Sequence, residues 1–260
     1  MPFSKKPKKI IAKTLLVEKK LCESLEEAEA LIYAGQVFAN EQRVQKPGQQ
    51  LFENVSLRVN KKEFVSRGAL KLQDAIRAFN LLNDFMNKTV LDVGASTGGF
   101  TDYVLKLGAH RVIAVDVGFN QLDWSLKTNP KVVSLEKTDI RNFDPIPYTP
   151  FHWILADISF NSLEAMAPFL LKLGSQETRF LLLIKPQFEL SGNEIPSGGV
   201  VTDETLWNKA IDKVISSLEK LGGRNFQIHK STIKGRSGNQ EFFIYFNGVD
   251  NQTQHVQLSP

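Results

Sequence analysis

The sequence contains one cysteine, Cys22, so the chain can form no internal disulfide and no cysteine-rich metal site. Its four histidines, His110, His152, His229 and His255, lack the short spacings typical of metal-binding pairs. We therefore expect no metal centre, and ordinary surface or core roles for the histidines.

Long apolar runs are also absent. No stretch of 18 apolar residues occurs in the 260-residue chain, although 42% of its residues are apolar. The N-terminus is rich in lysine but lacks the apolar segment of a secretory signal peptide. These absences predict a cytoplasmic protein that does not enter a membrane.

The net charge of +4 is unevenly distributed along the chain. Residues 1–62 contain 12 Lys/Arg against 7 Asp/Glu, whereas the remainder contains 20 against 21. A basic module joined to a neutral one indicates a polyanion-binding anchor beside a catalytic body. A solvated lysine-rich tail at residues 5–9 accounts for only part of this excess.

The most informative stretch is a short apolar strand that ends in a glycine-rich turn. The run from Val90 to Val93 contains Asp92, and a helical pattern starts near Phe100. Glycines allow a backbone to approach a ligand closely, and the first helical turn offers unpaired N–H groups. The expected cradle comprises Gly94, Ala95, Ser96, Thr97, Gly98, Gly99 and Phe100.

The surroundings of this turn indicate which ligand it holds. Its glycine spacing is not Gly-x-Gly-x-x-Gly, and no Gly-Lys-Ser/Thr follows. Asp92 suits an amine better than a pyrophosphate. Asp116 ends the next strand, 22 residues after Gly94, where a carboxylate can accept from ribose hydroxyls. Asp139 follows a third strand and could reach an adenine amino group.

An amine, a ribose and an adenine together make up S-adenosylmethionine. The pattern resembles the Rossmann-like methyltransferase superfamily, which implies that cofactor. The alternative is that Asp92 merely caps the turn and Asp116 is solvated. The three acids at successive strand ends favour the cofactor, and Asp157, after a fourth strand, is a further candidate contact.

Residues 1–60 form a separate predicted domain. Helical spacing covers residues 10–20, and Ser24 with Glu27 forms a capping box for a second helix that stops at Gly35. Residues 36–44 indicate a hairpin, and residues 55–59 a last strand. This order resembles the S4-type RNA-binding domain, so the resemblance implies contact with RNA.

Residues 61–66 are the predicted linker, residues 67–250 a methyltransferase domain and residues 251–260 a flexible tail. Strands and helices alternate after an entry helix over residues 64–82, which predicts a doubly wound α/β sheet. The last two strands are too close for a parallel crossover, so the seventh should be antiparallel. Strands are expected at 89–93, 111–116, 131–135, 152–157, 179–185, 225–232 and 240–246, and helices at 98–107, 119–127, 161–173 and 203–221.

Four ionisable residues lie where such a sheet would gather them: Lys71 before the first strand, Asp157 and Lys185 at strand ends, and Glu241 entering the last strand. Their order resembles the catalytic tetrad of FtsJ-like RNA 2′-O-methyltransferases. With the S4-like domain and the Ser66–Leu72 segment, the chain resembles the TlyA family, also called hemolysin A. Taken singly, each residue is better explained by an ordinary helix-face or strand-end ion pair, but the four in this order favour the tetrad.

The chemistry implied by that resemblance needs a proton acceptor. A ribose hydroxyl is a weak nucleophile, so it must be aligned with the methyl group and lose its proton. We expect Lys185 to be the general base, helped by partial burial and by the nearby cation Lys71. Asp157 and Glu241 would hold the two lysines and balance their charge.

A long loop, residues 190–202, follows the Lys185 strand and is predicted to be a flexible cover over the target nucleotide. Phe160 and Phe188 could stack on a flipped base, although core positions are at least as plausible for either ring.

The leading hypothesis is a methyltransferase that uses S-adenosylmethionine to modify ribose 2′-hydroxyls, with ribosomal RNA and ribosomal subunits as partners and cytidine as the implied target. The alternatives are a non-catalytic RNA-binding assembly factor, which the intact tetrad disfavours, and a pore-forming hemolysin, which the lack of apolar spans disfavours.

Overall fold

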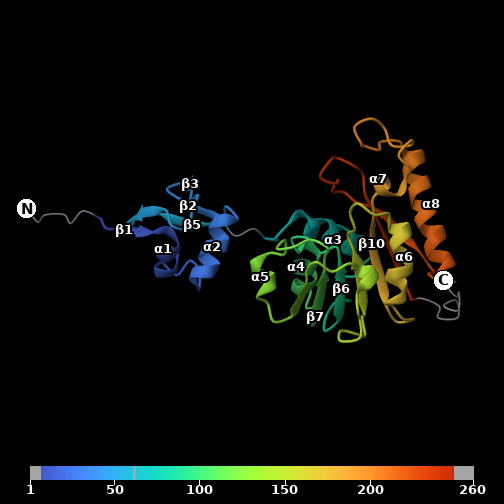
Figure 1. Cartoon of the computed structure of the whole chain (residues 1–260), viewed down its shortest axis with the longest axis horizontal. Coiled ribbons are helices and arrows are strands. Elements are labelled where there is room, and N and C mark those ends of the chain that lie inside the picture. Colours follow the sequence, from blue (N-terminus) through green and yellow to red (C-terminus); the bar gives the residue numbers. More distant parts are fainter. Residues whose placement is uncertain (1–6, 61–62, 249–260) are drawn as a thin grey trace, which may run out of the picture. The chain divides into compact units, whose positions relative to one another are not determined.

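The computed structural model describes residues 7–60 and 63–248, which form two compact units divided between residues 63 and 64 (Figure 1). Phe64 packs edge-on against Tyr103, with ring centroids 5.7 Å apart, and the Val65 N–H donates to Asp102 Oδ2 at 3.0 Å. The predicted linker over 61–66 is therefore wrong at its C-terminal end, because residues 64–66 belong to the second unit. Residues 61–62 of that linker and the predicted tail at 251–260 lie outside the described residues.

In its described residues, 7–60 and 63, the first unit contains two short helices and five short strands. The helices are α1 (Ala12–Glu18) and α2 (Leu25–Tyr33). Strands β2 (Val37–Ala39), β3 (Gln42–Arg43) and β5 (Leu57–Val59) form an antiparallel sheet in the order β3-β2-β5, and β1 (Lys9–Ile11) pairs antiparallel with β4 (Gln50–Phe52). Apolar side chains from both helices and from the strands fill one small core.

The two helix starts in this unit show what local sequence can and cannot predict. At α2, the N-cap Ser24 Oγ accepts from the Glu27 N–H at 3.1 Å, as the predicted capping box requires, while Glu27 Oε2 accepts at 2.8 Å from the N–H of Glu23, one residue before the N-cap. The predicted helix over 10–20 is wrong at its start, because Ile11 is extended and pairs with Gln50 in the β1–β4 ladder. A three-residue strand is too short to show a period, and β4 was not predicted at all.

The second unit is an α/β domain built on a seven-stranded sheet. Its strands are β6 (Thr89–Val93), β7 (Arg111–Val115), β8 (Val132–Leu135), β9 (Trp153–Ala156), β10 (Arg179–Ile184), β11 (Gln227–Lys230) and β12 (Phe242–Asn247). Its helices are α3 (Arg67–Ala78), α4 (Gly99–Lys106), α5 (Trp124–Lys127), η1 (Ile140–Asn142), α6 (Leu163–Lys172), α7 (Pro186–Glu189) and α8 (Glu204–Lys220).

The strand order is β11-β12-β10-β9-β6-β7-β8, and β12 runs antiparallel to both of its neighbours. The prediction of a doubly wound sheet with an antiparallel last strand is confirmed. Because β6, β7, β8, β9 and β10 are mutually parallel, their carboxyl ends meet at one edge. Ligand sites in open α/β sheets lie at that edge.

Both faces of this sheet are buried, so its central strands are apolar at nearly every position. Val90 on β6 and Leu181 on β10 belong to a core shared with α3 and α4, whereas their neighbours Leu91 and Leu182 belong to the core on the other face, shared with α6 and α8. This alternation fixes the register of the sheet, since a slip of one residue would exchange the two cores.

Two helices are clearly shorter than predicted, and a third was not predicted. The entry helix begins at Arg67 and ends at Ala78, since Asn80 adopts a left-handed φ of 59°. Helix α5 covers only the end of the predicted 119–127 segment, because Asn120 has a φ of 56° and Asp123 caps the helix. Helix α7 lies within the segment after Lys185, where no helix was predicted. Within the described residues, no helix is long and apolar enough to cross a membrane.

Candidate active site

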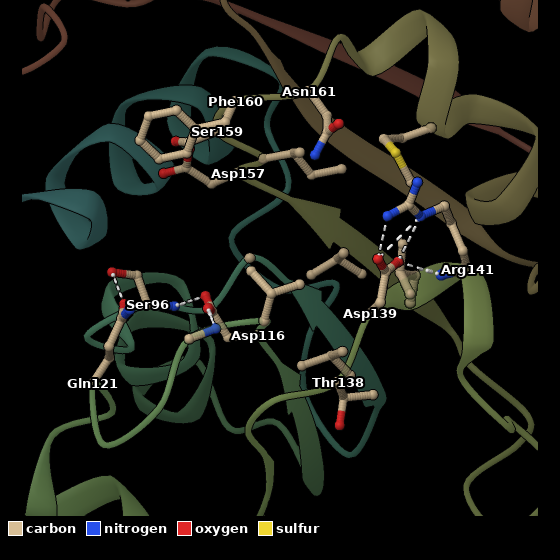
Figure 2. A pocket seen from close by; sticks show the side chains of 18 residues that line it. Ser96, Asp116, Gln121, Thr138, Asp139, Arg141, Asp157, Ser159, Phe160 and Asn161 are labelled. Atoms are coloured by element: carbon tan, nitrogen blue, oxygen red, sulfur yellow. Dashed lines mark hydrogen bonds and ion pairs between the residues drawn. The ribbon is translucent and has the colours of Figure 1, made fainter.

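A cavity of about 320 Å³ opens at the carboxyl edge of the sheet (Figure 2). Its walls come from the turn after β6, the loop after β7, and segments 138–141 and 157–161. The side chain of Met166, from α6, also lines it. The cavity thus collects residues that are far apart in sequence but follow neighbouring strands.

The glycine-rich turn serves both the cavity and the packing beneath it. Gly94 has a φ of 78°, and a Cβ added there would lie 2.5 Å from the backbone oxygen of Asp157. A Cβ on Gly99 would lie 2.8 Å from the backbone nitrogen of Ala69 at the start of α3. Of the seven expected cradle residues, Gly94 and Ser96 line the cavity. Phe100 is not among the cavity-lining residues, and it is 3% exposed in the core.

Two of the expected acids lie on opposite sides of the cavity (Figure 2). Asp116 Oδ2 accepts from the Ser96 N–H at 2.7 Å and Asp116 Oδ1 from the Gly118 N–H at 2.6 Å. These bonds shape the loop while each oxygen retains a free lone pair. Asp139 forms an ion pair with Arg141 at 2.5 Å, and this hydrogen-bonded partner lowers the pKa of Asp139. An adenine amino group would have to share the Asp139 carboxylate with Arg141.

Asp92 lies beneath the cavity and is not one of the residues that line it, so the expected contact between its carboxylate and a ligand amine stays a prediction. It is fully buried, and its Oδ2 accepts from the Thr101 N–H at 3.0 Å and from Thr101 Oγ1 at 2.6 Å. The N–H groups of the first turn of α4 have no intrahelical partner, which explains this orientation. Asp92 Oδ1 has no hydrogen-bond partner among the residues that the structure describes, and burial raises the pKa of Asp92 to about 7.

The structure brings the four expected catalytic side chains together as two ion pairs. Lys185 Nζ lies 2.6 Å from Asp157 Oδ1, and Lys71 Nζ lies 2.5 Å from Glu241 Oε2. Burial raises the pKa of Glu241, while the charges of Lys71 and Lys185 act in the opposite direction and that of Asp157 adds to the rise. Each lysine therefore has its own carboxylate, in the arrangement expected of Asp157 and Glu241.

Sequence reasoning missed several residues of the site. Ser159 Oγ accepts from Lys185 Nζ at 2.7 Å. Ser159, Gln121 and Arg141 all line the cavity. Ser159 could have been found, since it lies two residues beyond Asp157 in the same strand-end segment. Arg141 and Gln121 follow irregular loops whose course depends on tertiary packing. Among the described residues, no group of three or more His, Cys, Asp or Glu side chains could hold a metal ion.

A comparison with protein families decides what kind of enzyme this site belongs to. Residues 64–248 match the model of the FtsJ-like methyltransferases. The chain belongs to the FtsJ-like methyltransferase family. The match covers the whole sheet and begins at Phe64, the first residue of the second unit. The relatives described next also confirm the resemblance to the TlyA family.

One relative is the 16S/23S rRNA (cytidine-2′-O)-methyltransferase TlyA of Mycobacterium tuberculosis, which is 37% identical over 88% of this chain and 87% of its own. Hemolysin A of Brachyspira hyodysenteriae is 36% identical over 86% of this chain and 94% of its own. A solved structure from Streptococcus thermophilus, also named as a hemolysin, is 34% identical and superimposes with a TM-score of 0.69 over 94% of this chain and 90% of its own.

The first prediction concerns the glycine turn of this FtsJ-like domain. Gly94→Ala should weaken binding of S-adenosylmethionine at least about tenfold, because the new Cβ collides with the Asp157 backbone and the left-handed φ is strained. Isothermal titration calorimetry measures the affinity. Gly192→Ala is the matched control, since no atom lies within 4 Å of its Cβ position. Equal affinities in the two variants would contradict a close-packed cradle.

The second prediction concerns the buried carboxyl group of Asp92. Because its pKa is raised from 3.8 to about 7, its contribution to stability is fully present below pH 4 and is lost as the pH rises through 7. The free energy of unfolding of Asp92→Asn relative to the native chain should therefore rise by about 4 kcal/mol between pH 4 and pH 8. Urea titrations across this range test it. A difference independent of pH would show that Asp92 titrates normally.

Proposed function

We propose that this protein transfers the methyl group of S-adenosylmethionine to a ribose 2′-hydroxyl of ribosomal RNA, with cytidine as the target nucleoside. The observation that carries the proposal is the pairing of Lys185 with Asp157 and of Lys71 with Glu241 beside a cavity at the carboxyl edge of the sheet. The ribosomal substrate and the cytidine target are supported by the TlyA relative.

The cavity fits the methyl donor. Asp116 has the lone pairs to accept from both ribose hydroxyls, and Gly94 leaves room for the methionine part of the cofactor. The unpartnered Asp92 Oδ1 is a buried acceptor directly beneath the turn, which suits the cofactor's ammonium group. When bound, S-adenosylmethionine supplies a methyl group already activated by a positive sulfur.

Lys185 is the proposed general base. Its side chain is 8% exposed, and Asp157 and Ser159 hold its Nζ in place from the same strand-end segment. In this role Lys185 would take the 2′-hydroxyl proton while the ribose oxygen bonds to the methyl carbon and the methyl–sulfur bond breaks to release S-adenosylhomocysteine. Asp157 would stabilise the lysine ammonium. Glu241 holds Lys71 in the neighbouring ion pair, and the positive charge of Lys71 can orient the acceptor ribose.

Phe160 is suited to hold the target base. The residue is 91% exposed at the cavity rim, and its φ of 69° is unusual for a bulky residue. Phe188 lies 6.0 Å away, ring centroid to centroid. A single-stranded or flipped base could stack on this exposed ring while its ribose faces Lys185.

The first unit is the proposed RNA anchor. It carries exposed basic side chains, and two of them lie over aromatic rings: Lys9 over Phe52 at 5.2 Å, and Arg58 over Phe38 at 5.1 Å. Basic groups beside exposed aromatic surface can neutralise phosphates and stack with unpaired bases. This supports an S4-like role in capturing the substrate.

The third prediction tests the general base. Lys185→Ala should lower the rate of tritium transfer from labelled S-adenosylmethionine to unmodified ribosomal subunits at least about 100-fold, because the hydroxyl proton has no acceptor. Binding of S-adenosylhomocysteine should remain measurable. Lys172→Ala removes an exposed lysine at the end of α6 and should leave the rate unchanged. A Lys185→Ala rate within twofold of the native rate would exclude Lys185 as the base.

The fourth prediction tests the RNA anchor. Replacing the exposed residues Lys8, Lys9 and Lys46 by alanine should weaken RNA binding and reduce the slope of log affinity against log salt by about 2 to 3. Cofactor affinity should not change. The control replaces Lys172 and Lys220, two exposed lysines of the second unit. An unchanged salt slope in the triple variant would argue against phosphate contacts by these lysines.

A further inference from the structure

Glu189, the last residue of α7, is a buried carboxylate bound to the start of another helix. Only 2% of its surface is exposed. Its Oε1 accepts from the Leu163 N–H at 2.6 Å and its Oε2 lies 3.3 Å from the Glu164 nitrogen, which donates to it. Ser162 Oγ accepts from the Ala165 N–H at 3.1 Å. The three N–H groups at the start of α6 are thus satisfied by two side chains, one of them from a different helix.

The position of Glu189 in the chain gives this contact its importance. Helix α7 begins directly after Lys185, and α6 begins directly after segment 157–161, which carries Asp157, Ser159 and Phe160. The hydrogen bonds from Glu189 to α6 therefore connect the segment after Lys185 with segment 157–161, and these two segments supply the Lys185–Asp157 ion pair. The same two segments place Phe160 beside Phe188.

Helix α8 reinforces this junction. Lys213 Nζ donates to the backbone oxygen of Glu189 at 2.9 Å and forms an ion pair with Glu164 at 2.8 Å. One lysine thus ties the end of α7 and the first turn of α6 to a third element. The charged groups that act on the Glu189 carboxylate are Lys213 and Glu164, together with the positive end of the α6 dipole.

A carboxylate is a costly group to bury here, and burial raises the pKa of Glu189. A neutral glutamine has only one acceptor oxygen, so it cannot accept from both N–H groups through separate atoms. An apolar residue would leave both buried donors unpaired. The carboxylate is therefore the side chain that can hold both donors at this place.

We propose that Glu189 is a positioning residue for methyl transfer, which fixes segment 157–161 against Lys185 by binding the first turn of α6. The proposal rests on the proposed function of Lys185. Glu189 acts through Asp157, Ser159 and Phe160 and does not touch the reacting atoms. A residue that only caps the helix would contribute to stability but not to the transfer rate. Ser162, which caps the same helix, therefore serves as the control that distinguishes capping from positioning.

The test compares Glu189→Gln with Ser162→Ala in the full-length protein. Ser162→Ala removes the other side-chain cap of α6 but leaves the bridge to α7 intact. The melting temperature of each variant is measured, so that their transfer rates can be compared with their losses of stability. Amide hydrogen exchange is followed in peptides covering residues 157–166 and 99–106, and methyl transfer is measured on unmodified ribosomal subunits.

In Glu189→Gln we expect exchange to accelerate about tenfold in residues 157–166 but not in α4, and the transfer rate to fall about tenfold. In Ser162→Ala the transfer rate should stay within twofold of the native rate. A native rate in Glu189→Gln, or an equal loss in Ser162→Ala at equal melting temperature, would overturn the proposal.

Two further outcomes are covered: a variant that does not fold, and a native protein that transfers no methyl group. If Glu189→Gln does not fold, Lys213→Met is the second variant, because it loosens the same junction while keeping the Glu189 carboxylate. Lys213→Met should speed hydrogen exchange in residues 157–166 and slow methyl transfer about threefold. If neither the exchange rate nor the transfer rate changes, the proposal is refuted. If the native protein transfers no methyl group to ribosomal RNA, the proposed function fails, whereas the exchange data still decide whether Glu189 fixes segment 157–161.

Discussion

The ion pair between Lys185 and Asp157 joins the ends of two adjacent parallel strands, β10 and β9, and the proposed chemistry depends on it. The pair is largely withdrawn from solvent, with side-chain exposures of 8% and 25%. Burying charges costs free energy that their attraction often fails to recover, so such a pair is weak support for stability. Its place beside the cavity, next to the second pair of Lys71 and Glu241, favours a role in catalysis.

The close packing of the sheet edge keeps this arrangement in place. Gly94 allows the turn after β6 to lie against the backbone of Asp157, so the cofactor cradle and one member of the ion pair share a contact. Glu189 then ties the segment after Asp157 to the segment after Lys185. The glycine-rich turn and the segments that carry the proposed base and the exposed Phe160 are thus linked by the close approach at Gly94 and by the side-chain hydrogen bonds of Glu189.

Much of this arrangement could be predicted because its signals are local. β6 lies over the expected residues, and the other sheet strands lie close to theirs, since apolar runs bounded by turns are visible in sequence. The ionisable residues at strand ends could be anticipated, since parallel strands gather their carboxyl ends at one edge. The Ser24–Glu27 capping box likewise needs only four consecutive residues.

The features that could not be predicted depend on tertiary contacts. The β1–β4 ladder pairs three-residue segments about 40 residues apart, and α7 is a single turn. The side chain of Asp92 binds Thr101 because α4 leaves that N–H unpaired, which strand-end position alone does not reveal. Asp157 and Glu241 were expected to hold the two lysines, but which carboxylate pairs with which lysine depends on how α3 and β12 pack at the sheet edge.

The most direct test of the central claim is to map 2′-O-methyl groups at single-nucleotide resolution on ribosomal subunits incubated with the native protein and S-adenosylmethionine. The account predicts new methylation confined to the ribose of defined cytidines. Methyl groups found on bases, or no methylation of either subunit by a protein shown to bind the cofactor, would contradict it.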